Sequence, residues 1–188
     1  MKKSVLSLLL LALMFTWVSC GDGRQDSAEM AEDQNEESLD NKVEDDAEFA
    51  VEAADASLME VELGTLALTK ASSPEVKQFA QKMVEEHTKA SNELKVMAQQ
   101  KNITLPSAMG NEHRRKYDNL IEKSGADFDK EYMDLMVKDH KDDLDEFEDQ
   151  AEEGEDPELK SWASSKVTTL RQHLEEAERI QEAVKDRG

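Results

Sequence analysis

Hydrophobic and polar positions follow a helical period over four long stretches of the chain. These stretches cover about 48–70, 73–101, 127–153 and 156–185, and each carries an apolar stripe with charged residues on its other faces. A stripe that repeats every three to four residues is typical of an amphipathic helix that buries one face. The chain shows no run of alternating apolar and polar residues that would indicate a strand. The pattern therefore predicts an all-α fold.

Proline and glycine mark the ends of the predicted helices. Ser73-Pro74 and Asp156-Pro157 each place an N-cap residue before a proline at the first helical position, which is a strong start signal. A further short helix is expected over 111–123, before Ser124-Gly125. Four long stripes of similar length imply an antiparallel four-helix bundle, with this extra short helix between the second and third long helices.

The longest apolar run lies near the start of the chain and leads to its only cysteine. The run over 5–18 follows a short basic stretch and has about the length of a signal-peptide core. Ser19 is the small residue expected before a cleavage site, whereas Trp17 stands where an aliphatic residue is usual. We interpret 1–19 as a bacterial lipoprotein signal peptide and Cys20 as the acylated first residue of the mature chain.

Two alternatives to the lipoprotein interpretation remain open, namely an ordinary cleaved signal peptide and a permanent membrane anchor. The second fits less well because no stop-transfer pattern follows the apolar run. After the cysteine, residues 20–47 are strongly acidic and their few apolar residues form no stripe. Such a segment buries too little apolar surface to offset its chain entropy, so it is expected to be a disordered tether. The remainder, 48–188, is expected to form the bundle domain.

The charge of the chain limits its partners. The formal net charge is −21, and acidic residues are spread over the whole length. Nucleic-acid phosphates and anionic lipid headgroups would both be repelled. We therefore expect no nucleic-acid partner, and membrane contact only through the lipid anchor. This places the protein in the bacterial cell envelope, at the outer membrane or the periplasmic face.

Each of the four predicted long helices carries one ionisable residue on or at the edge of its apolar stripe, close to the middle of the helix. These residues are Glu60, His87, His140 and His173. In an antiparallel bundle, mid-helix positions share one level, so the four side chains are expected to form a polar layer in the core. Three imidazoles and a carboxylate suit Zn²⁺, Fe or Cu. The fourth histidine, His113, lies on the short helix and is expected at the surface.

A polar layer of this kind has alternative roles, because a buried Glu–His pair can also fix helix register without metal. The di-iron pattern needs Glu-x-x-His on two helices, but the residues three positions before the histidines are Val84, Val137 and Leu170. Ferroxidase chemistry is therefore not expected. Met83 and Met136 each stand one turn before a histidine. Thioether and imidazole together suit copper, although methionine on such a stripe also serves as ordinary core.

Several segments together resemble a known family. They are 53–64, 71–80, Met83-Val84-Glu85-Glu86-His87, Ile103-Thr104-Leu105-Pro106, 132–135 with Met136-Val137-Lys138-Asp139-His140, and 170–174. In combination they resemble the exported bacterial family known as domain of unknown function 4142, over about 49–184. The resemblance implies a ferritin-like helical bundle without an established activity. It also implies that Glu86-His87, Asp139-His140 and His173 match recurrent positions of the family.

The sequence leaves two functions open. It contains no nucleophile motif, phosphate-binding glycine loop or cofactor fingerprint, which favours a non-enzymatic role. The first hypothesis is a lipid-anchored, extracytoplasmic binding or envelope-associated protein with no established cofactor. The second is a metal-binding or redox site for a transition metal in the bundle core.

Overall fold

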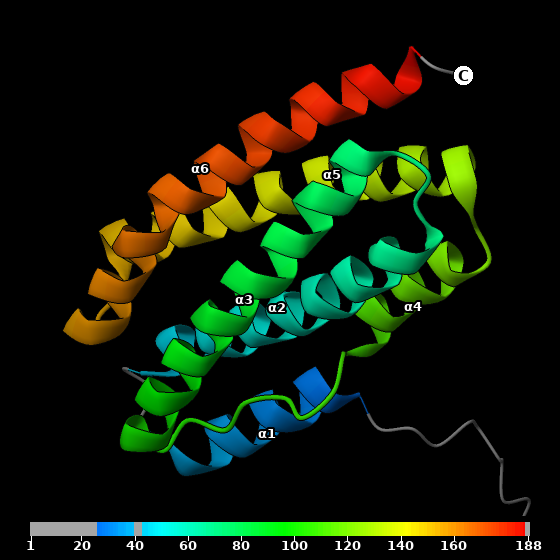
Figure 1. The fold of residues 1–188 in the computed structure, drawn as a ribbon. Helices are drawn as coiled ribbons and strands as arrows, with labels where there is room; N and C mark the ends of the chain where they lie inside the picture. The colour runs from blue at the N-terminus through cyan, green and yellow to red at the C-terminus, as the bar shows by residue number, and fades with distance from the viewer. Residues whose placement is uncertain (1–25, 40–42, 187–188) are drawn as a thin grey trace, which may run out of the picture.

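The computed structural model describes residues 26–39 and 43–186, and most of them are helical. The helices are α1 (Ser27–Ser38), α2 (Glu44–Lys70), α3 (Pro74–Lys101), α4 (Asn111–Ile121), α5 (Gly125–Glu153) and α6 (Pro157–Lys185). Over the described ranges there is no strand, only an isolated bridge between Ala71 and Gly125. The four long helices pack as a bundle (Figure 1). The predicted all-α bundle is confirmed.

The helix starts that were predicted from proline are present. The helix α6 begins at Pro157, and the Asp156 side chain accepts hydrogen bonds from the backbone N–H groups of Glu158 and Leu159 at 3.0 and 2.9 Å. The helix α3 begins at Pro74 after Ser73, but here Asp129 of α5 accepts hydrogen bonds from the N–H groups of Ser72 and Ser73. A cap-type residue followed by proline therefore predicts a helix start correctly even where the side chain of that residue does not cap the helix.

The segment that was expected to be a disordered tether is helical over residues 27–38 and 44–47. It holds α1 and the first turn of α2. The helix α1 buries only Ala31 and Asn35, and the Asn35 side chain donates to the carbonyl of Thr104 at 3.0 Å and accepts from its N–H at 2.7 Å. Figure 1 shows α1 beside the loop that joins α3 to α4. The spacing of apolar residues gives no sign of a helix that is held by polar contacts of this kind. The expectations for residues 1–19 and Cys20 lie outside the described residues.

The first turn of α2 fixes the connection between α5 and α6. Asp46 is 2% exposed, and its carboxylate accepts hydrogen bonds from Gln150 Nε2 at 2.6 Å and from the N–H groups of Glu155 and Asp156 at 3.2 and 2.6 Å. The helix therefore begins at Glu44, before the expected start, because a buried carboxylate in this turn binds donors from the α5–α6 connection.

The apolar core consists of two clusters, one toward each end of the bundle. One cluster draws on residues 59–67 of α2, 76–83 of α3, 128–137 of α5 and 177–184 of α6. The other contains Phe49, Leu94, Phe147 and Trp162 among its members. In α3, α5 and α6 the two clusters are separated by positions 87, 140 and 173. A polar layer thus divides the core at the level that the sequence predicted.

In the part of the chain that the structure describes, none of the helices combines the length and apolarity needed to cross a bilayer.

Candidate metal centre

Three histidines from three helices converge between the two apolar clusters. His87 of α3, His140 of α5 and His173 of α6 are all buried. The ring centroids lie 5.6 Å apart for His87–His140, 5.5 Å for His87–His173 and 5.4 Å for His140–His173. One nitrogen of each ring lies within 4.8 Å of a nitrogen of the other two. Imidazole nitrogens bind a metal at about 2 Å. Small ring rotations that move each nitrogen by about 1 Å bring all three nitrogens within reach of one ion.

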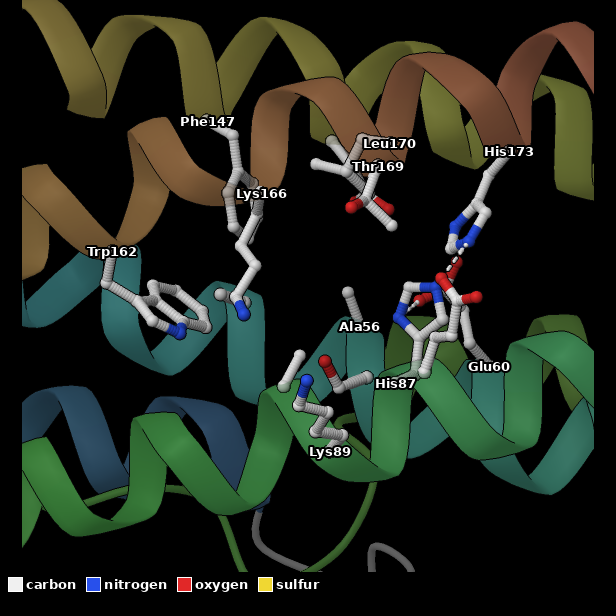
Figure 2. Close-up of a pocket in the computed structure, with 15 residues that line it drawn as sticks. Ala56, Glu60, His87, Lys89, Phe147, Trp162, Lys166, Thr169, Leu170 and His173 are labelled. Atoms are coloured by element: carbon white, nitrogen blue, oxygen red, sulfur yellow. Dashed lines mark hydrogen bonds and ion pairs between the residues drawn. The ribbon is translucent and has the colours of Figure 1, made fainter.

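Each of the three imidazoles has one nitrogen fixed by an oxygen acceptor. The pairs are His87 Nδ1 with Glu60 Oε2 at 2.5 Å, His140 Nδ1 with Met136 O at 3.0 Å, and His173 Nε2 with Glu86 Oε2 at 2.7 Å (Figure 2 shows the first and third). Because carboxylates and carbonyls only accept, these ring nitrogens donate their protons. Such contacts orient metal-binding histidines and select their tautomer.

The opposite nitrogen of each ring remains free. His87 Nε2, His140 Nε2 and His173 Nδ1 are buried and have no hydrogen-bond partner among residues 26–39 and 43–186. A buried polar atom without a partner carries a free-energy cost, and native structures contain few of them. Three such atoms on neighbouring rings form a donor set that fits one metal ion.

Glu60 lies in the same layer but contacts the other side of the rings. It is 1% exposed, and its carboxylate approaches Nδ1 of His87 and, at 3.4 Å, Nδ1 of His140. The predicted convergence of the four side chains is therefore confirmed. The three imidazoles bring one nitrogen each close to the other two rings. Glu60 contacts the Nδ1 atoms of His87 and His140 and so holds these two rings in place.

Burial sets the protonation state of this layer. It lowers the pKa of His140 to about 4 and, together with the neighbouring His87, also lowers the pKa of His173. Both rings are therefore neutral near pH 7, which is the form that binds metals. Burial alone would raise the pKa of Glu60, but the imidazoles around it, with the hydrogen bond from His87, lower it below the usual range. The layer accordingly holds the Glu60 carboxylate beside the neutral imidazoles of His140 and His173.

A cavity of about 250 Å³ adjoins the centre. His87, His173 and Glu60 line one end, and Phe147 and Trp162 line the other (Figure 2). Two of the three imidazoles therefore border this cavity, whereas His140 is not in its lining.

His113 is not the surface residue that the sequence suggested. Its side chain is 18% exposed, and its Nδ1 lies 2.7 Å from Oδ2 of Asp55, whose Oδ1 accepts the N–H of Gly110 at 2.7 Å. The pair ties α4 and the preceding loop to α2. Short-helix periodicity did not reveal this contact because it depends on how α4 docks.

The two methionines that suggested a thioether–imidazole copper site pack in the core. Met83 and Met136 are fully buried in the apolar cluster toward one end of the bundle. Met136 contributes to the centre through its carbonyl oxygen, which receives His140. The structure therefore assigns both side chains a packing role.

Two buried aspartates near the centre were not predicted. Asp143 is 9% exposed, and one of its oxygens, one of Glu60 and a nitrogen of His140 all lie within 4.8 Å of one another. Asp139 is buried one turn earlier. Burial, with the charge of Glu60, raises the pKa of Asp143 well above its usual range. Asp143 follows His140 by three residues and shares its stripe, but its acidic side chain does not stand out in so acidic a sequence.

The family model for the domain of unknown function DUF4142 matches residues 28–180. The chain belongs to this family. The match begins inside α1, so the family domain includes the helix that sequence analysis assigned to the tether.

Similarity to a solved structure supports the helical fold of the chain. Among solved structures, the chain is similar to "CopM in the Cu(II)-bound form", with a TM-score of 0.63 and 19% identity over 73% of this chain and 96% of that chain. At this identity the likeness supports the helical fold alone. No curated protein matches the chain significantly.

Proposed function

We propose that this protein binds one copper(II) ion at His87, His140 and His173. The observation that carries the proposal is the set of three buried ring nitrogens without hydrogen-bond partners among the described residues. Each belongs to a ring whose other nitrogen is already fixed by Glu60, Met136 or Glu86. The arrangement resembles the second sphere of known metal sites, where acceptors orient histidine ligands.

Copper(II) is favoured over zinc and iron by the chemistry of the donors. The affinity of nitrogen sites for divalent first-row metals is highest for Cu²⁺. Three imidazoles therefore bind copper more tightly than Zn²⁺ or Fe²⁺. Residues 84, 137 and 170 are apolar, so the Glu-x-x-His elements of a di-iron site are missing from this sequence. The similar solved structure, whose title names its Cu(II)-bound form, also supports this choice.

The residues around the centre serve binding rather than turnover in this proposal. The rings present lone pairs at their free nitrogens, Glu60 and Glu86 keep two of the rings oriented, and an apolar cluster packs on either side of the layer. A bound copper ion supplies tight, reversible ligation and one-electron chemistry. We therefore infer a copper-holding protein, and the cavity beside the imidazoles is the route by which the ion exchanges.

Copper titration of the metal-free protein tests this proposal. We expect one equivalent to bind, with loss of binding in His140→Leu and His173→Leu because each variant removes one of three ligands. His113→Gln is the matched control, since this histidine pairs with Asp55 and is not part of the three-imidazole group. Isothermal calorimetry and elemental analysis measure both. Less than about a tenth of an equivalent bound, or equal losses in the control, contradicts the proposal and favours a purely structural polar layer.

We further propose that Cys20 is acylated and holds the bundle in the cell envelope. Cys20→Ser is expected to abolish incorporation of labelled palmitate and to move the protein from the membrane fraction to the soluble fraction. The physical reason is that a strongly acidic surface gives no attraction to anionic lipid once the acyl chains are lost. If the wild-type protein incorporates no labelled palmitate, or if Cys20→Ser stays in the membrane fraction, the proposed lipid anchor is contradicted.

A further inference from the structure

A second cavity lies on the other side of the polar layer, between α2, α4 and α5. It measures about 280 Å³, and aspartate and glutamate predominate in its lining. Lys116 and His113 are the basic residues there. Lys116 Nζ reaches Asp139 Oδ1 at 3.2 Å and a carboxylate of its own helix, and His113 pairs with Asp55. The basic groups are thus already engaged at the α4 side of the cavity.

Asp139 and Asp143 line the inner end of this cavity, and Glu60 lies beside Asp143. Asp143 is nine-tenths buried and takes part in no hydrogen bond or ion pair within the described chain. Glu60 Oε1 and Asp139 Oδ2 are also buried without a hydrogen-bond partner in residues 43–186. A buried carboxyl group that is neither paired nor hydrogen-bonded is costly. Among the described residues Asp143 lacks a partner, while Glu60 and Asp139 each keep one oxygen without a hydrogen bond.

We propose that Glu60 and Asp143 bind a second, oxygen-preferring divalent cation of the Mn²⁺, Mg²⁺ or Ca²⁺ class. An oxygen of Glu60 and an oxygen of Asp143 lie within 4.8 Å of each other, which an ion bound at about 2.0–2.6 Å to each can span. Such ions are commonly held by one or two carboxylates and by water, and the cavity has room for water. Asp139, one turn before Asp143, faces the same cavity and can accept from that water.

This second site is distinct from the three-imidazole centre. His140 Nδ1 donates to the carbonyl of Met136, so it is not available as a ligand here. Glu60 connects the two sites, because its Oε2 holds His87 while its Oε1 faces the second cation. Carboxylate and water ligands favour Mg²⁺, Ca²⁺ and Mn²⁺, whereas imidazoles favour copper, so the two sites select different metals.

Manganese provides the probe, because free Mn²⁺ gives a six-line electron paramagnetic resonance signal that broadens on binding. The protein is first loaded with one equivalent of Cu²⁺ and then titrated with Mn²⁺. We expect one Mn²⁺ to bind, and Asp143→Asn to raise its dissociation constant at least about tenfold, since a charged ligand is lost. Asp145→Asn, an exposed position on the same helix with the same charge change, is the matched control. Competition with Ca²⁺ and Mg²⁺ then identifies which ion of the class fits best.

Two further readouts separate this inference from the proposed copper site. Copper stoichiometry and far-ultraviolet circular dichroism are expected to be unchanged in Asp143→Asn, which shows that the bundle is intact. His173→Leu is expected to lose copper and to keep Mn²⁺. Equal Mn²⁺ affinity in wild type, Asp143→Asn and Asp145→Asn overturns the second site, as does loss of Mn²⁺ together with copper in His173→Leu.

Discussion

Copper(II) at a thousandfold excess over its dissociation constant is expected to raise the free energy of unfolding by about 4 kcal/mol. The ion would join α3, α5 and α6 in the native state, whereas the unfolded chain does not hold His87, His140 and His173 together. Denaturant unfolding with and without copper measures the increase. In His140→Leu the increase is expected to vanish.

The metal-free variant supplies the decisive comparison. Leucine at this position removes a buried nitrogen without a partner in the described structure, Nε2, together with the Nδ1 donor to the Met136 carbonyl, so a gain and a loss oppose each other. We therefore expect the metal-free stability of His140→Leu to lie within about 1 kcal/mol of wild type. A structural polar layer predicts the reverse pattern, in which copper has little effect and the variant is destabilised by several kcal/mol. Equal stabilisation of both proteins by copper would place the ion elsewhere.

Asp46→Ala is expected to lower the free energy of unfolding by about 3 kcal/mol. The buried carboxylate receives the Gln150 amide and the N–H groups of Glu155 and Asp156, so alanine leaves three donors without their acceptor. Thermal and denaturant unfolding measure the loss. Copper stoichiometry should stay at one equivalent, because Asp46 lies at the far end of the bundle from the imidazoles.

Asp45→Ala is the matched control for this prediction. Asp45 is adjacent, lies in the same first turn of α2 and is exposed. A surface substitution of this kind changes stability by less than about 0.5 kcal/mol. If Asp45→Ala and Asp46→Ala behave alike, the first turn of α2 does not fix the α5–α6 connection as described above.

The sequence predicted most of the bundle because most of it depends on local signals. Proline after a cap residue located the starts of α3 and α6, and helical stripes located the inward positions. The same stripes brought Glu60 and the three histidines to one level, since mid-helix positions of an antiparallel bundle share a level. These inferences need only the helical period and helix length, which one sequence contains.

The parts that the sequence did not predict depend on tertiary polar contacts. Asn35 docks α1 through a backbone group 69 residues away, and Asp46 binds donors more than 100 residues away. His113 and Asp55 meet only because α4 folds back onto α2. Asp143 was on the correct stripe, but an acidic residue in an acidic chain is not by itself a signal. Its burial became apparent only from the packing of α2 against α5.

The most direct test of the account is anomalous diffraction at the copper edge from crystals of the protein loaded with one equivalent of Cu²⁺. We expect a single strong peak between Nε2 of His87, Nε2 of His140 and Nδ1 of His173, about 2 Å from each nitrogen. A peak at surface carboxylates, with the three imidazoles free of metal, would contradict the copper centre.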